Sequence, residues 1–275
     1  MMTTILICIL VVALYVLSLQ GRKGHKGLSK LQGWAYAHRG LHGPNVPENS
    51  MAAFRAAVEA GYGAELDVHL LRDGRLAVFH DFSLQRVAGA EVRIEELTAP
   101  ELANYRLSDT QEQIPLFEDV LALFAGKAPL IVELKVADNN YEALTKAVCQ
   151  MLDQYKVTYC IESFDPRCIR WLKKYRPDVI RGQLADNSLR NKHANVLLPL
   201  RFIMTYSLLN FLTRPDFLAY KFAHRKNLSN FLVRRLWGVQ GVAWTLTARD
   251  SFDEAVKEGW LPIFEGFCPD GNITE

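Results

Sequence analysis

The 275-residue sequence lacks the cysteine spacing that a thiolate zinc site or a disulfide framework requires. Its five cysteines are scattered without a C-x-x-C pair, and one of them lies inside the apolar N-terminus. Free cysteine is among the most buried residue types, so we expect these cysteines to be small side chains of the hydrophobic core. The sequence also lacks a strong net charge, because the formal value is +2, and this argues against a nucleic-acid partner.

Charge is absent altogether at the start of the chain. No charged side chain precedes Arg22, and residues 5–19 are almost entirely apolar. About 20 apolar residues span a bilayer as a helix, so we predict a transmembrane anchor over residues 1–21. A cleaved signal peptide would instead have cations before the apolar run. Because cations follow it, at Arg22, Lys23 and Lys26, we expect a single-pass membrane protein with its folded domain on the cytoplasmic side.

Apolar runs alternate with helical patterns after a basic linker over residues 22–33, as in a parallel sheet covered by helices. The expected strands are 35–38, 64–68, 76–80, 130–135, 159–164, 179–184, 217–221 and 242–246. The expected helices are 50–60, 116–124, 141–155, 166–175 and 251–258. This number of strands predicts an α/β fold, a (β/α)₈ TIM barrel over residues 34–275 with its site at the carboxyl ends of the strands.

The connection between the second and third expected strands is too short for a helical crossover. Its sequence, Arg72-Asp73-Gly74-Arg75, predicts a tight turn. A plain hairpin pairs residues whose numbers sum to 147, which places Asp67 opposite His80. Glu65 then lies on the same face, so two carboxylates and an imidazole share one pocket.

Acidic residues occupy expected buried strands at Glu65, Asp67 and Glu133. Ionised carboxylates are costly to bury unless they are paired or bind a metal. Three of them at one barrel mouth suit a hard divalent cation such as Mg²⁺ or Ca²⁺. The alternative is ordinary salt bridging, in which Lys135 or Arg39 neutralises the acids.

Five short motifs follow one another in the first third of the chain. They are His38-Arg39-Gly40, Pro47-Glu48-Asn49-Ser50, Glu65-Leu66-Asp67-Val68, Arg72-Asp73-Gly74 and His80-Asp81. Their order and spacing closely resemble the glycerophosphodiester phosphodiesterase family, with its H-R-G, P-E-N-[ST], E-x-D-V, D-G and H-D motifs. The resemblance continues through Val132-Glu133-Leu134-Lys135, Ser163-Phe164 and Trp244-Thr245-Leu246. The chain departs from it at Phe264-Glu265-Gly266-Phe267, where the family commonly has T-D-x-P.

The resemblance implies a barrel of the phospholipase-C-like phosphodiesterase type that hydrolyses glycerophosphodiesters to an alcohol and sn-glycerol 3-phosphate. The family's metal ligands, acid and base histidines, and substrate-contacting side chains match eight positions of this chain. They are, in that order, Glu65, Asp67 and Glu133; His38 and His80; and Arg39, Lys135 and Trp244. The sequence leaves open which histidine is the acid, which divalent metal binds, which headgroup is preferred and what the oligomeric state is.

Cations and apolar clusters alternate over residues 183–240. This segment contains nine Lys or Arg residues and only two acidic residues, both Asp. Such a surface suits anionic lipid headgroups, although barrel helices with a solvated basic face are the alternative. The sequence therefore keeps two further functions open: a lysophospholipase D that acts on membrane lipids, and a non-catalytic barrel that binds lipid headgroups. The intact histidines and carboxylates favour an enzyme.

Overall fold

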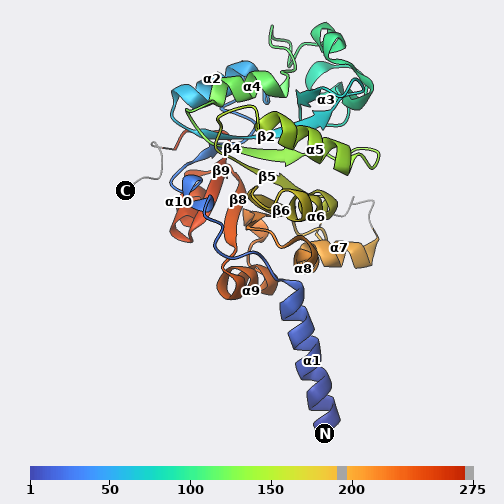
Figure 1. Cartoon of the computed structure of the whole chain (residues 1–275). Helices are drawn as coiled ribbons and strands as arrows, with labels where there is room; N and C mark the ends of the chain where they lie inside the picture. Colours follow the sequence, from blue (N-terminus) through green and yellow to red (C-terminus); the bar gives the residue numbers. More distant parts are fainter. Residues whose placement is uncertain (191–196, 270–275) are drawn as a thin grey trace.

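The computed structural model describes residues 1–190 and 197–269, and its centre is a closed ring of eight parallel strands with helices outside (Figure 1). The ring consists of β1 (Tyr36–Ala37), β2 (Gly63–Leu70), β4 (Leu130–Leu134), β5 (Tyr159–Ser163), β6 (Arg181–Ala185), β7 (Phe217–Lys221), β8 (Gln240–Leu246) and β9 (Trp260–Phe264). It closes because β1 pairs with both β2 and β9. The predicted (β/α)₈ barrel is therefore confirmed.

Two strands of the prediction need correction. The last ring strand, β9, was missed, because Pro262 interrupts its apolar run and proline normally argues against a strand. The segment counted in its place forms β3 (Leu76–Val78), which pairs antiparallel with β2 and lies outside the ring.

The predicted register of the β2–β3 hairpin was wrong by one residue. Val68 pairs with Val78, so facing numbers sum to 146, and Asp67 lies opposite Phe79, whose N–H donates to its carbonyl at 3.0 Å. The loop has three residues instead of two, and Gly74 takes the left-handed conformation (φ +83°) that such loops require. Because β3 ends at Val78, His80 lies beyond the ladder and its direction is not fixed by strand alternation.

All five predicted helices form: α2 (Met51–Glu59), α4 (Phe117–Phe124), α5 (Tyr141–Leu152), α6 (Pro166–Tyr175) and α10 (Arg249–Lys257). Side chains cap two of them, since Ser50 accepts from the Ala53 N–H and Asp165 accepts from the Arg167 N–H. The other helices are α3 (Gln85–Ala88), α7 (Leu198–Thr205), α8 (Asn210–Thr213), α9 (Leu228–Trp237) and the 3₁₀ turns η1 (Leu28–Lys30), η2 (Ile94–Glu96), η3 (Ala99–Asn104) and η4 (Phe222–His224).

The segment expected to be a linker packs against the amino ends of the strands. Leu31 is fully buried among residues of the barrel interior such as Ile131 and Phe217, and its carbonyl accepts from the Tyr36 hydroxyl at 2.8 Å. Arg22 forms an ion pair with Asp216, just before β7. Residues 22–33 thus close the floor of the barrel, while the boundaries drawn at 21 and 33 stay a prediction. Three cysteines are buried as expected, whereas Cys8 and Cys268 are exposed.

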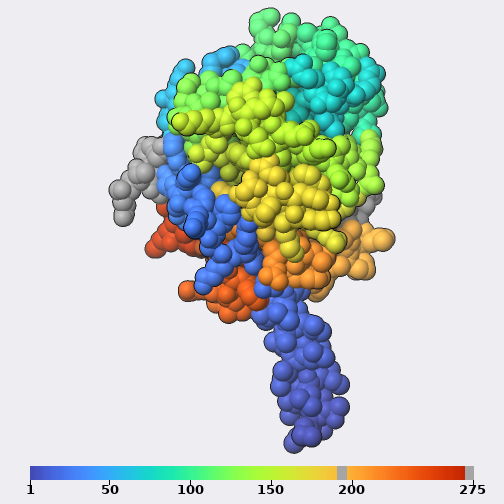
Figure 2. All heavy atoms as spheres, viewed as in Figure 1, coloured from blue at the N-terminus to red at the C-terminus, as the bar shows by residue number. Residues whose placement is uncertain are grey.

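The N-terminal helix α1 (Met2–Ser18) projects from the rounded body as a separate rod (Figures 1 and 2). Among the described residues, no helix has both the length and the apolar character needed to cross a membrane. The transmembrane span predicted over residues 1–21 is therefore not found: α1 has 17 residues, about 26 Å at 1.5 Å per residue. Its end is held to α9, where Trp237 Nε1 donates to the Val16 carbonyl at 3.1 Å.

Candidate active site

Three acids meet at the carboxyl ends of β2 and β4. Asp67 and Glu133 face each other in register, and carboxylate oxygens of these two residues and of Glu65 all lie within 4.8 Å of one another. All three side chains are buried. Burial, reinforced by Asp67, raises the pKa of Glu65 well above its usual value, and burial raises the pKa of Glu133 to about 7. The three carboxylates therefore repel one another, and a bound cation would relieve the repulsion.

The surroundings of Asp67 fit a hard divalent cation. Its Oδ2 accepts from Asn49 Nδ2 at 2.9 Å, whereas its Oδ1 receives no hydrogen bond from the described residues. Lys135 Nζ lies 3.3 Å from that Oδ1 and 2.9 Å from Glu133 Oε1. An all-oxygen set of this kind is the one that Mg²⁺ and Ca²⁺ prefer. The residues present therefore fit such an ion, with Lys135 beside it.

Cations keep one of the acids ionised. Burial alone would raise the pKa of Asp67, but Lys135 and Arg39, joined by His80 when it is protonated, outweigh burial and hold that pKa well below its usual range. The same contacts act on the ammonium group: burial works to lower the pKa of Lys135, and Asp67 and Glu133 raise it above its usual value. Lys135 therefore stays charged at the mouth.

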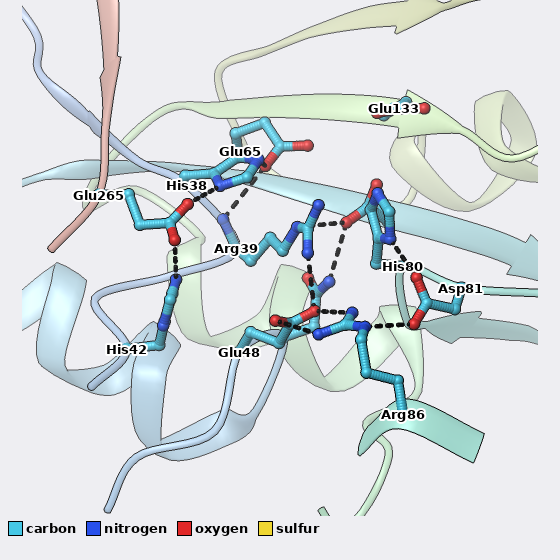
Figure 3. Close-up of polar contacts among 12 residues, drawn as sticks. His38, Arg39, His42, Glu48, Glu65, His80, Asp81, Arg86, Glu133 and Glu265 are labelled. Atoms are coloured by element: carbon cyan, nitrogen blue, oxygen red, sulfur yellow. Dashed lines mark hydrogen bonds and ion pairs between the residues drawn. The ribbon is translucent and has the colours of Figure 1, made fainter. Parts of the chain in front are cut away.

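His38 follows β1 and is held between two acids (Figure 3). Its Nε2 lies 3.8 Å from Glu65 Oε2, and its Nδ1 lies 2.5 Å from Glu265 Oε2. Glu265 comes directly after β9, and the hydrogen bond to His38 lowers its pKa. His42 Nε2 lies 3.8 Å from the other oxygen of Glu265. The carboxylate of Glu265 fixes the imidazole of His38 so that its Nε2 points toward Glu65 and the other two acids.

His80 has a carboxylate partner in the same position. Its Nδ1 lies 2.6 Å from Asp81 Oδ1, and Arg86 Nε donates to the other oxygen of Asp81 at 2.6 Å. Burial lowers the pKa of His80 despite the opposing charge of Asp67. The neutral imidazole therefore predominates near neutral pH. Both histidines are bound through Nδ1, which leaves each Nε2 available for proton transfer.

Arg39 links the histidine motif to the acids. Its backbone N–H donates to Glu65 Oε2 at 3.1 Å, and its Nη1 donates to Glu48 Oε1 at 2.8 Å. Its Nε lies 3.6 Å from Asp67 Oδ2. Glu48 also accepts two hydrogen bonds from Arg86. Arg39 has a positive φ of 54°, a conformation that non-glycine residues adopt rarely and that clusters at functional sites.

The structure brings together seven of the eight predicted positions through the contacts above. The eighth, Trp244 on β8, packs edge-to-face on Phe164 with ring centroids 5.9 Å apart. Its Nε1 is buried and has no hydrogen-bond partner among the described residues. This aromatic pair stands at the carboxyl ends of β5 and β8.

Several polar residues of this region carried no role in the sequence analysis. Glu265 was noted only as a departure from a motif, because β9 had been missed. Glu48, Asn49 and Asp81 were quoted only as members of motifs. Arg86 lies in a segment without a recognisable pattern. Glu162 pairs in register with Glu133 and is buried, and burial raises its pKa well above the usual value. Glu162 lies on an expected buried strand, as Glu133 does. Its acidic side chain there was therefore a signal in the sequence that pointed to the site.

Fold and site together define a class: an α/β barrel with three buried acids that fit a hard cation and two oriented imidazoles at the carboxyl ends of its strands. The sequence profile of the glycerophosphoryl diester phosphodiesterase family matches residues 38–264, most of the chain. The chain therefore belongs to this family of phosphoric diester hydrolases, as the motifs predicted.

Individual relatives share about a third of their residues with the chain over its better-matched half. The glycerophosphodiester phosphodiesterase of Bacillus altitudinis is 32% identical over 155 residues, which are 52% of this chain and 63% of that protein. The lysophospholipase D of Homo sapiens is 33% identical over 154 residues, 51% of this chain and 46% of that protein. The matches thus span less than two thirds of these two relatives.

Solved structures share the fold over a larger part of the chain. An Oleispira antarctica phosphodiesterase in complex with the product sn-glycerol-3-phosphate has a TM-score of 0.71 and 21% identity, covering 87% of this chain and 94% of that one. A glycerophosphodiester phosphodiesterase from Parabacteroides distasonis has a TM-score of 0.64 and 24% identity, covering 84% and 92%. The similarity establishes the barrel.

Proposed function

We propose that the chain hydrolyses glycerophosphodiesters to an alcohol and sn-glycerol 3-phosphate. The observation that carries the proposal is that three buried acids, which fit a divalent cation, lie beside two histidines, each oriented by its own carboxylate. The product bound in the Oleispira structure and the name of the Bacillus relative support the choice of substrate.

The chemistry follows from the charge of a phosphodiester. Glu65, Asp67 and Glu133 would hold the cation, which offsets negative charge on the phosphoryl oxygens. Arg39 and Lys135 add fixed positive charge for the non-bridging oxygens of the substrate. One histidine takes the proton of the attacking hydroxyl through Nε2, and the other gives a proton to the leaving alkoxide. Which histidine performs which step stays open.

Glu265 is proposed as a positioning residue for His38. Replacing it with glutamine keeps the shape but removes the charge that fixes the imidazole, so kcat should fall by about 10 to 10² while KM changes little. Glu265→Asp should recover part of the loss, since it restores the carboxylate. Steady-state kinetics with glycerophosphocholine measure the effect. Glu254→Gln, at an exposed side chain of α10 that pairs with Arg225, is the control, and an equal fall of kcat in that variant would contradict the role.

A lysophospholipase D is the second candidate, and one feature favours it. A small apolar hollow lies beside Phe164 and is walled by Ile203 and Met204 of α7 and by Leu209. It opens near the carboxyl ends of β5 and β6, where an acyl chain of a bound lysolipid would find apolar contact. The human relative carries the name of this activity.

Hydrolysis of glycerophosphocholine and of lysophosphatidylcholine, each measured with Mg²⁺, Ca²⁺ or a chelator, tests both candidates. We expect turnover of glycerophosphocholine that stops with the chelator. If the hollow takes an acyl chain, Met204→Glu should lower turnover of the lysolipid at least about tenfold and leave the soluble diester within about twofold, since a buried charge is costly. Turnover of neither substrate under any metal condition would leave the non-catalytic headgroup-binding barrel.

Contact with a membrane surface is the remaining part of the proposal. Apolar side chains of α1 are exposed along most of its length, and further exposed apolar side chains lie on α7, α8 and α9. Large exposed apolar patches mark interaction sites. The part of this surface on α7, α8 and α9 falls within residues 183–240, of which 191–196 lie outside the described residues. The cytoplasmic placement inferred from Arg22, Lys23 and Lys26 requires a spanning helix, and the described residues contain none.

A further inference from the structure

A basic pocket lies at the foot of α1, away from the catalytic mouth. The residues that form it come from five parts of the chain: the turn after α1, the end of α6, the start of β6, the residue after α8, and the end of α9. Its five cationic side chains are Arg22, Lys23, Lys173, Arg181 and Arg214. None of the described residues that line it is acidic. Because Arg181 begins β6, the pocket is at the opposite end of the strands from the acids.

The acid behind the pocket, Asp216, is already occupied. Arg22 donates to both of its carboxylate oxygens, and the Arg181 backbone N–H donates to Oδ2 at 3.0 Å. Arg22 also donates to the carbonyl of Val179 at 3.0 Å. This carboxylate lies beside both Arg22 and Arg181, and no other acid among the described residues lines the pocket. Lys173 Nζ donates to the Leu212 carbonyl at 2.8 Å, a neutral partner that leaves its charge unpaired.

Two guanidinium groups have buried nitrogen atoms without partners. Arg181 is 2% exposed, and its Nε donates to the Thr213 carbonyl at 3.2 Å. Its Nη1 is buried and makes no hydrogen bond to a described residue. Arg214 Nε is likewise buried and unpartnered. Burial and the charge of Arg22 lower the pKa of Arg181 to about 10. Buried donors without acceptors are destabilising, so an anion in the pocket would stabilise them.

Apolar side chains adjoin the cations of the pocket. Leu236 and Trp237 of α9 line it, Leu236 is 55% exposed, and the apolar side chains of α1 are exposed along most of its length. Figure 1 shows α1 leaving the body beside α8 and α9. Cations flanked by an exposed apolar helix match the layers of a bilayer surface, with charged headgroups outside and acyl chains inside.

We propose that this pocket binds the phosphate headgroup of an anionic phospholipid and thereby fixes the barrel against the membrane. The phosphate oxygens accept from Arg181, Arg214 and Lys173, in charge-assisted hydrogen bonds. The acyl chains lie along α1 and Leu236. A free phosphate ion would make the hydrogen bonds to the cations but not the apolar contacts of the acyl chains. The lipid should therefore bind more tightly than the free ion. The inference concerns a site separate from the catalytic mouth and does not depend on which diester is hydrolysed.

A calorimetric titration tests the site in the full chain held in neutral detergent micelles. The probes are phosphatidic acid with two six-carbon chains, the corresponding phosphatidylcholine, and inorganic phosphate. We expect saturable binding of the phosphatidic acid, with at least about tenfold weaker binding of the other two probes. The double substitution Lys173→Gln and Arg214→Gln should weaken binding of the phosphatidic acid at least about tenfold. The pair Lys127→Gln and Lys146→Gln, distant basic residues with the same loss of charge, should leave it within about twofold.

Two results would overturn the proposal. Equal affinity for inorganic phosphate would make this a site for soluble anions, and equal losses in the two double variants would reduce the effect to overall charge. Hydrolysis of glycerophosphocholine, measured in the same samples, should be unchanged in both variants and reports an intact barrel. The single substitution Lys173→Gln, at an exposed side chain, repeats the test without altering the buried guanidinium groups, and binding equal to that of the original chain would also contradict the site.

Discussion

Replacing His80 with alanine should lower kcat for glycerophosphocholine by about 10² to 10⁴, the usual contribution of one proton-transfer group, and leave folded protein. His38→Ala should have an effect of the same size. The structure explains why neither loss should be partial. Each imidazole is bound through Nδ1 to its own carboxylate, which holds its Nε2 in place for proton transfer, and neither of these oriented groups can substitute for the other. Steady-state kinetics and thermal unfolding together measure the effect.

A matched control comes from the other end of the barrel. His25 contacts the Asp178 carbonyl near the amino ends of the strands, and His25→Ala should retain most activity. The double variant His38→Ala and His80→Ala should lose little more than either single variant, because residues that act in one reaction are strongly non-additive. Most of the turnover surviving in both single variants would refute acid-base catalysis by this pair.

Glu133→Gln should abolish the dependence on a divalent metal and lower activity by at least about 10², since the metal supplies several kcal/mol of charge stabilisation. Metal that binds only the folded state raises the unfolding temperature, so Mg²⁺ or Ca²⁺ should stabilise the original chain. The variant should lose this shift. Scanning calorimetry with and without a chelator measures it without reference to catalysis.

The pH dependence of the metal-free protein adds a second measurement. The pKa of Glu133 is raised to about 7 from an ordinary 4.5, so the folded state holds the proton more tightly than the unfolded state. The stability from this group is complete below about pH 4.5 and is lost as the pH rises through about 7. Glu133→Gln should make the fall in unfolding temperature shallower over this interval, and added metal should do the same in the original chain.

Glu162 provides the control for both measurements. It is buried, pairs in register with Glu133 on the neighbouring strand, and lies outside the three-acid cluster. Glu162→Gln should therefore keep the metal-induced stabilisation. If Glu162→Gln loses the metal-induced stabilisation and Glu133→Gln keeps it, the cation site has been assigned to the wrong acids.

The sequence predicted the barrel because its signals are local. Buried runs, helix caps and the five motifs each lie within a few residues, and the acids on β2 and β4 are conspicuous on otherwise apolar strands. The prediction of the hairpin register was wrong for an equally local reason. The Asp73-Gly74 pair is typical of both two-residue and three-residue loops, and only the backbone conformation distinguishes them.

The missing parts of the site are those that depend on closure of the ring. Glu265 reaches His38 because β9 pairs with β1, a contact between residues 227 positions apart. No local pattern announces such a contact, and Pro262 concealed the strand that makes it. The basic pocket at the foot of α1 was missed similarly, because its cations come from five separate parts of the chain.

The floor formed by residues 22–33 bears on how the catalytic part can be isolated. Shortening the chain to begin at Trp34, where the predicted barrel starts, would remove Leu31 from beneath the strands and leave Asp216 without Arg22. Water would then reach apolar side chains of the interior, and a buried carboxylate would lose its counter-charge. A shortened chain that begins at Leu19 removes α1, keeps the fully buried Leu19 in the core, and leaves the floor of the barrel in place.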